Sequence, residues 1–400
     1  MLIFLFEWLQ SMHVKVPTAF TYFSTRMILA AATGLILTIF LGPRFIKKLY
    51  ELKIGQSIRS QEEVPLLAEL HGKKKDTPTM GGILILFAMA ISLLFWMDLR
   101  NIFTWILFFT TIVLGCLGAM DDYFKLRYKN SKGLKGKTKM LIQVGFSSLV
   151  ALYLLVPGFH QAVGFGKVLR PPVAKEQIVS EGKKMRVTLS TQEYTKLFYL
   201  PFFKGAIFDF PVWFAFCFVV FVITGSSNAV NLTDGLDGLA AGCLVMVSLV
   251  LALFAFLSNH IDLARYLNIL YIEGSGEIAV YLFALAGAAL GFLWYNGYPA
   301  QVFMGDTGSL AMGGVLGVSS VLLRREVILA IAGAIFVAEA LSVILQVLSY
   351  RYRNKKRVFL CAPLHHHFEY LGWPETKVVI RFWIISLLFA MIAVSSLKLQ

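Results

Sequence analysis

Long apolar runs, rather than amphipathic stripes, dominate the pattern of this sequence. A helix needs roughly 20 mostly apolar residues to cross the hydrocarbon core of a bilayer. Runs of about that length predict ten membrane-spanning helices, at residues 22–43, 80–98, 102–120, 140–157, 209–229, 239–258, 277–295, 309–323, 327–349 and 378–397. We therefore predict an all-α polytopic membrane protein, with residues 1–400 forming a single integral membrane domain.

Composition strengthens this prediction. Hydrophobic residues make up 58% of the 400 positions, charged residues only 15%, and the mean hydropathy is +0.71. A soluble domain carries more charge and cannot bury this much apolar surface in one core. Glu7 interrupts the apolar start and no small-residue cleavage site follows, so no removable signal peptide is predicted. Three of the four cysteines lie inside predicted spans, which argues against a disulfide framework.

One long polar connection, residues 158–208, separates the fourth and fifth predicted spans. Within it the stretch KKMRVTLST alternates polar and apolar residues, and Pro171-Pro172 interrupts the chain before it. Alternation of this kind is typical of strands, so we expect a small exterior β-hairpin here.

The positions of Lys and Arg predict the orientation. Segments 44–75, 125–139 and 351–377 hold 21 of the 37 Lys and Arg residues, and all three follow odd-numbered spans. Because basic loops stay in the cytoplasm, these segments should be cytoplasmic and both termini should lie outside. The net charge of +14 then reflects membrane topology and is no indication of nucleic acid binding. Such loops also attract phosphorylated substrates and anionic lipids of the bilayer.

Acidic residues gather at the predicted cytoplasmic ends of three spans. Asp121 and Asp122 end the third span, NAVNLTDGLDG (228–238) follows the fifth, and NGYPAQVFMGDTG (296–308) follows the seventh. The last two loops contain no Lys or Arg, although their side should be positive. A divalent cation such as Mg²⁺, which binds carboxylates and substrate phosphates, would supply the missing charge. A single Asp often merely ends a helix, but three such loops on one side favour a metal and phosphate site.

The spacing of these residues supports convergence. Asn228, Asn231, Asp234 and Asp237 are three apart, so on a helix they would lie roughly along one stripe. Adjacent residues 121 and 122 cannot share a helix face. One of these two carboxylates should point at the site, while the other caps a helix, forms a pair or binds metal.

Two further segments carry candidate chemistry. TPTMGG (77–82) begins the second span after a lysine run, and hydroxyls with glycine amides at a helix start suit phosphate. Three histidines, 365–367, lie near Cys361; zinc is one interpretation, but adjacent histidines rarely form a closed tetrahedral set, so phosphate or sugar contact is favoured. Within the ninth span, Gln346 is interpreted as packing, whereas Glu339 stays open between function and helix pairing.

Five motifs together resemble those of the phospho-N-acetylmuramoyl-pentapeptide-transferase family. They are TPTMGG (77–82), DD (121–122), NAVNLTDGLDGLA (228–240), MGDTGS (304–309) and PLHHHFEYLGWPE (363–375). The resemblance runs from about residue 20 to the C-terminus, apart from residues 158–208. NLTDGLDG and the acid pairs are shared with the wider superfamily of polyprenyl-phosphate sugar-1-phosphate transferases, whereas HHHFEYLGWPE is similar to the muramoyl-pentapeptide branch.

The resemblance implies an activity and its partners. Members of the family transfer phospho-N-acetylmuramoyl-pentapeptide from UDP-N-acetylmuramoyl-pentapeptide to undecaprenyl phosphate, which yields lipid I and UMP with Mg²⁺. This is the first membrane step of peptidoglycan synthesis, and it serves cell wall biogenesis, cell shape and cell division. The resemblance also implies location in the bacterial inner membrane, an active site that faces the cytoplasm, and a homodimer.

The resemblance assigns roles by motif position. It implies that Asp121, Asp122 and Asp306 are catalytic and that Asp306 is the metal ligand. The substrate-binding residues it implies are Lys74, Thr79, Lys125, Lys137, Asn231, Asp234, Asp237, Asn296, Phe303, His365 and His366. Asp76 departs from the family pattern, which has glycine before Thr-Pro-Thr, and this puts the assignments of Lys74 and Thr79 in doubt.

Two rival functions remain at this point. Another superfamily transferase would use UDP-N-acetylglucosamine, and an ion-coupled transporter would use membrane carboxylates as a relay. Transporters tend to place such acids near the midplane on broken helices, often within inverted repeats, whereas here the acids lie at span ends and no repeat is visible. For the transferase, direct attack by the lipid phosphate is favoured over a covalent intermediate, because an anionic acceptor needs little activation.

Overall fold

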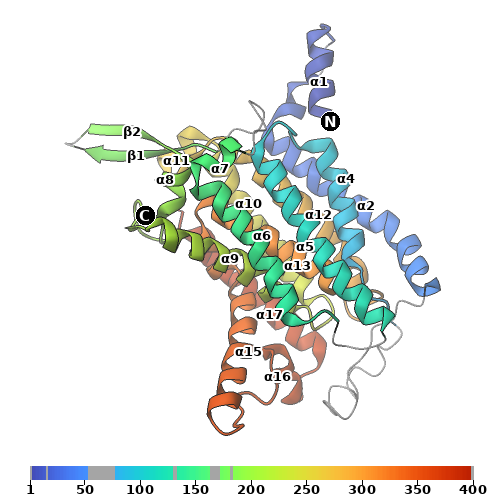
Figure 1. Ribbon diagram of the computed structural model, residues 1–400. Helices are drawn as coiled ribbons and strands as arrows, with labels where there is room; N and C mark the ends of the chain where they lie inside the picture. The colour runs from blue at the N-terminus through green and yellow to red at the C-terminus, as the bar shows by residue number, and fades with distance from the viewer. Residues whose placement is uncertain are drawn as a thin grey trace.

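The computed structural model of the chain describes residues 2–14, 17–52, 77–128, 133–162, 172–180 and 183–397, and most of them are helical (Figure 1). In this part of the chain, nine helices are long and apolar enough to cross a membrane. They are α2 (Phe23–Glu51), α5 (Ile102–Arg127), α6 (Gly136–Leu155), α9 (Val212–Thr233), α10 (Leu239–Ser258), α12 (Gly276–Asn296), α13 (Gly305–Leu323), α15 (Ala334–Tyr352) and α17 (Glu375–Ser395). The predicted all-α polytopic class is confirmed.

Two of the ten predicted spans differ from expectation. The run at 80–98 forms α4 (Gly82–Trp96), whose 15 residues rise only about 22 Å, less than the roughly 30 Å of a hydrocarbon core. This helix begins late because Met80 adopts a positive φ of 70°. The run at 327–349 is divided at Gly333 into α14 (Glu326–Ala332) and α15.

Short elements complete the described chain. The predicted hairpin is confirmed as β1 (Ala174–Ser180) paired antiparallel with β2 (Lys183–Leu189), and β5 (Tyr271–Ile272) adds to the other edge of β1. A second small sheet pairs β3 (Leu197–Phe198) with β4 (Phe208–Asp209). The short helices are α1 (Leu2–Ser11), η1 (Thr18–Thr21), α7 (Pro157–Ala162), α8 (Thr191–Lys196), α11 (Ile261–Tyr266) and α16 (Leu364–Tyr370).

Helix α13 lies at the centre of the bundle and is almost entirely buried (Figure 1). Its first turn meets two other helices through glycine. A Cβ on Gly118 of α5 would overlap the backbone of Asp306, and a Cβ on Gly82 of α4 would overlap the backbone of Gly308. Small residues let helices in a membrane approach this closely. The end of α5 and the start of α4 are therefore held against the start of α13.

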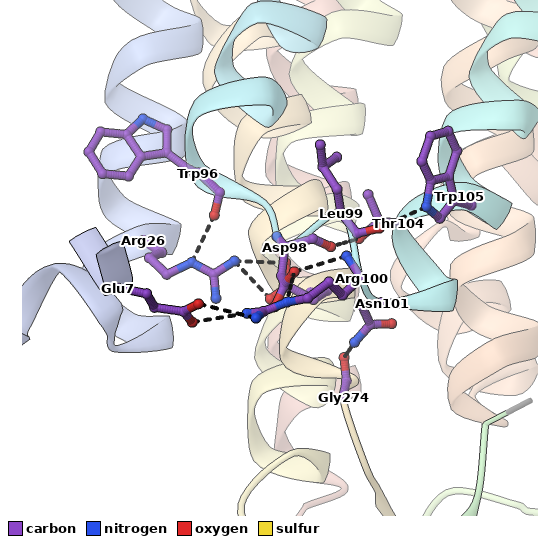
Figure 2. Close-up of polar contacts among 11 residues, drawn as sticks. Glu7, Arg26, Trp96, Asp98, Leu99, Arg100, Asn101, Thr104, Trp105 and Gly274 are labelled. Carbon is purple, nitrogen blue, oxygen red and sulfur yellow. Dashed lines mark hydrogen bonds and ion pairs between the residues drawn. The ribbon is translucent and has the colours of Figure 1, made fainter. Parts of the chain in front are cut away.

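We call the end of the bundle where α5 and α9 finish and α13 begins the acidic end, and the opposite end, which carries β1 and β2, the hairpin end. A polar network joins helices at the hairpin end (Figure 2). Arg26 of α2 donates to both carboxylate oxygens of Glu277 in α12, at 2.7 and 2.8 Å, and both residues are buried. Arg100 joins Asp98 to Glu7 of α1. Removing one partner of such a buried pair typically costs about 3–5 kcal/mol, so the network fastens α2 to α12.

Candidate functional site

Three carboxylates from distant parts of the sequence meet at the acidic end. Asp121 and Asp122 lie in the last turns of α5, and Asp306 lies in the first turn of α13. Each offers one oxygen such that the three oxygens lie within 4.8 Å of one another. Among the described residues, this is the group of three acidic, histidine or cysteine side chains that could hold a metal ion.

Asp122 caps helix α13. Its Oδ2 accepts the backbone N–H of Thr307 at 3.0 Å and the Thr307 hydroxyl at 2.7 Å, while Oδ1 accepts the N–H of Asp306 at 3.2 Å. The first amides of a helix have no partner within the helix, and the positive end of the helix dipole favours an anion there. Asp122 therefore fixes the helix start that carries Asp306.

Asp121 faces two lysines instead. Lys125 Nζ lies 2.7 Å from Asp121 Oδ2 and 3.2 Å from Asp306 Oδ2, and Lys139 Nζ lies 2.7 Å from both of these oxygens. The backbone N–H of Leu134 donates to the other Asp121 oxygen at 2.7 Å. The two lysine ammonium groups thus lie among the three carboxylates and balance part of their negative charge, as a bound metal ion would. An oxygen-rich cluster with one surplus negative charge suits a hard divalent cation.

The end of α9 supports Asp306 from a third side. The Asn231 amide donates to Asp306 Oδ1 at 2.9 Å and to the Ser309 hydroxyl at 2.8 Å. Asp234, just beyond the end of α9, accepts the backbone N–H of Gly305. Burial, together with the negative charges of Asp306 and Asp122, raises the pKa of Asp234 to about 8. Without a metal, this carboxyl group therefore keeps its proton at neutral pH.

Three other predicted residues tie neighbouring loops together. Asp237 accepts the backbone N–H of Ala300 at 3.0 Å, and Asn296 accepts that of Gly238 at 3.0 Å. The backbone of Phe303 bonds to Pro78 and Gly81, which precede α4. These contacts hold the loops after α9 and α12, and the segment before α4, around the carboxylate cluster.

The remaining predicted residues occupy different environments. Thr79 is nearly buried beside Gly305, whereas Lys137 is exposed in the first turn of α6. Lys74 lies outside the described residues. His365 is fully buried, whereas the side chain of His366 is 17% exposed and its Nδ1 lies 2.7 Å from Glu369 Oε2. The two histidines therefore differ in what a substrate can reach.

Sequence reasoning assigned no site role to Lys139 or Thr307, which both contact the cluster. Lys139 is one of six lysines at residues 125–139, and nothing in the sequence separates it from its neighbours. Thr307 lies inside the MGDTGS motif directly after Asp306, so a search for capping hydroxyls at the start of α13 could have found it.

Comparison with known proteins supplies a family. The model described as glycosyl transferase family 4 matches residues 104–324, and phospho-N-acetylmuramoyl-pentapeptide-transferase signature 1 matches residues 74–86. The chain is 62% identical to a phospho-N-acetylmuramoyl-pentapeptide-transferase of Protochlamydia amoebophila, over all of both chains. It is 44% identical to proteins of the same name from Desulfotalea psychrophila, over 95% of each chain, and from Oleidesulfovibrio alaskensis, over 99% of this chain and 100% of the relative.

Proposed function

Since the chain belongs to the phospho-N-acetylmuramoyl-pentapeptide-transferase family, we propose that it forms lipid I from UDP-N-acetylmuramoyl-pentapeptide and undecaprenyl phosphate. In this reaction an oxygen of the lipid phosphate attacks the β-phosphorus of the donor. A new phosphorus–oxygen bond forms there, the bond from the β-phosphorus to the bridging oxygen breaks, and UMP leaves. The observation that carries the proposal is the cluster of Asp121, Asp122 and Asp306 at a helix end, where a lipid phosphate and a soluble nucleotide can meet.

The orientation belongs to this proposal. The chain is a multi-pass membrane protein, and we place its acidic end in the cytoplasm of a bacterium and both termini outside the inner membrane. The ends of α2, α5 and α15 and the start of α6 carry eight of the 21 predicted cytoplasmic Lys and Arg residues, in support of this placement. The nucleotide donor would then reach the site from the side where it is made.

Magnesium fits the donor set of the cluster. Asp306 would be its main ligand with help from Asp121, because both carboxylates now share ammonium groups that a metal could displace. When bound, Mg²⁺ supplies positive charge that neutralises the diphosphate and the leaving UMP. Asp122 would serve mainly by holding the first turn of α13.

The protein's own residues would position the reactants. Lys125 and Lys139 stabilise negative charge on the transferred phosphoryl group, in the way that cationic clamps act in other phosphoryl transfers. Asp121 is placed to orient the lipid phosphate or accept its proton. We assign donor contacts to a further set that surrounds the cluster: Lys74, Thr79, Lys137, Asn231, Asp234, Asp237, Asn296, Phe303 and His366. We favour direct attack; a trapped covalent phospho-sugar enzyme would show a two-step reaction instead.

A donor assay tests the proposal. Purified protein is given undecaprenyl phosphate and Mg²⁺ with either UDP-N-acetylmuramoyl-pentapeptide or UDP-N-acetylglucosamine, and UMP and the lipid product are measured. We expect UMP only with the muramoyl donor, and release only with the N-acetylglucosamine donor would refute the proposed substrate. Asp306→Ala should abolish turnover. Asp209→Ala removes an exposed carboxylate at the hairpin end and should leave it unchanged.

The homodimer is a further part of this proposal and rests on the family resemblance. Light scattering of the purified protein, corrected for detergent, measures the mass of the protein part. A mass of one chain at every concentration tested would contradict the dimer.

A further inference from the structure

Glu339 and His365 form a buried pair beneath the loop that carries Asp234. Glu339 lies in α15 and His365 in the first turn of α16, and both are fully buried. Both carboxylate oxygens accept the backbone N–H of His365, at 3.1 and 3.4 Å, and Oε1 lies 3.1 Å from the ring Nδ1. A buried carboxylate is costly unless such contacts compensate it. Glu339 therefore fixes the backbone of His365 through hydrogen bonds and lies against the Nδ1 edge of the imidazole.

The opposite edge of the imidazole meets Gly235, which follows Asp234 directly. Neither ring nitrogen of His365 has a hydrogen-bond partner among the described residues, and Nε2 is the one that faces Gly235. The three atoms nearest to a Cβ built on Gly235 all belong to the His365 ring; that Cβ would overlap Nε2 and lie 2.7 Å from Cε1. The φ of Gly235 is not in the left-handed region, so the ring, rather than the backbone, demands glycine. The imidazole thus packs against one side of the loop at Gly235, while the other side of this glycine is exposed to solvent.

We propose that Glu339 is a positioning residue of the transfer reaction. Through His365 it holds the backbone at Gly235 and thereby fixes where Asp234 stands beside Asp306. This inference rests on the proposed function for the reaction that it serves, while the contacts themselves do not depend on it. It gives a task to a buried charge inside a membrane-spanning helix, a position where such residues are commonly functional. His365 is then a support beneath the site, and contact with substrate in this segment is left to His366.

Glu339→Gln keeps the shape of the side chain but removes its charge. We expect kcat to fall about tenfold or more while the KM for the nucleotide changes less than about threefold, because positioning acts on the transition state. Amide hydrogen exchange of residues 234–238, measured without substrate, should become faster. Ser342→Ala is the matched control in α15, since the Ser342 hydroxyl bonds to the backbone oxygen of Glu339. Unchanged kcat and exchange in Glu339→Gln would overturn the inference.

A mutant cycle tests the support itself and does not depend on whether Glu339→Gln folds. Gly235→Ala alone should lower kcat by about tenfold or more, because its Cβ displaces the ring, but in a His365→Ala background it should cost less than about threefold. Gly225→Ala in α9, where a Cβ meets nothing within 4 Å, should retain wild-type activity. If the two single losses simply multiply, the ring is not the obstacle and the inference fails. Absence of UMP release from the wild type would instead refute the proposed function, and the exchange measurement would still test the pair.

Discussion

Asp122→Asn separates a helix cap from a metal ligand at the centre of the site. Asparagine has one acceptor oxygen where aspartate has two, so its amide must face either Thr307 or the N–H of Asp306. At least one charge-assisted hydrogen bond is lost, which costs about 1.5–3 kcal/mol. The favourable interaction of the carboxylate with the start of α13 adds about 0.3–1 kcal/mol.

Coulomb interactions within the cluster do not reverse this result. Asp306 repels Asp122 from within 4.8 Å, and Lys125 attracts it from 4.0 Å. At an effective dielectric constant of about 20, each interaction amounts to about 3–4 kcal/mol, so the two nearly cancel. The negative charge of Asp121 is already met by Lys139 at 2.7 Å. Asparagine also relieves the cost of burying a charged carboxylate at this position. The lost hydrogen bonds, at about 2–4 kcal/mol in favour of the wild type, therefore set the upper bound of the destabilisation.

Thermal unfolding in detergent with EDTA measures this difference in the absence of metal. For a chain of this length, about 3 kcal/mol corresponds to a Tm lower by about 4 °C. Thr307→Val removes only the hydroxyl bond to Asp122 and should give an intermediate shift, whereas Thr307→Ser should melt close to the wild type. A metal-free Asp122→Asn protein that melts at or above the wild-type temperature would show that Asp122 does not cap α13.

Three further outcomes follow from the contacts around Asp306. Asn231→Ala should lower kcat about 10- to 100-fold, because Asn231 orients the carboxylate of Asp306 and loss of such a residue has an effect of this size. Asn228→Ala, one turn away and bonded to Gln143, is the control, and an equal loss in both variants would contradict the argument. Lys139→Ala should lower the Mg²⁺ concentration for half-maximal activity about threefold or more, because the Lys139 ammonium pairs with Asp121 and Asp306, the carboxylates proposed to bind the metal. An increase in that Mg²⁺ concentration would refute this. The pKa of Asp234 is about 8 in the folded chain and 3.8 in the unfolded chain, so the unfolded chain loses this proton first as the pH rises. The Tm measured in EDTA should therefore fall between about pH 4 and about pH 8, and Asp234→Asn should make the Tm depend less on pH.

Several structural features follow from local pattern alone. Runs of apolar residues long enough to cross a bilayer located the spans, because that length depends only on the membrane thickness and the rise of a helix. The alternation near 183–191 located the hairpin. The late start of α4 and the division at Gly333 were missed, because hydropathy reports neither the φ of Met80 nor the non-helical backbone of Gly333.

The sequence by itself determined that the chain crosses a membrane repeatedly and that acidic residues lie at the ends of three spans, two of them in loops without Lys or Arg. It also required Asp121 and Asp122 to take different roles, because adjacent residues on a helix point in different directions. Only the tertiary structure decided that Asp122 is the residue that caps α13 and that Lys125 and Lys139, out of the six lysines at 125–139, reach Asp306. These facts depend on how helices more than a hundred residues apart pack against one another, and a glycine that permits such contact looks the same in sequence as one that does not.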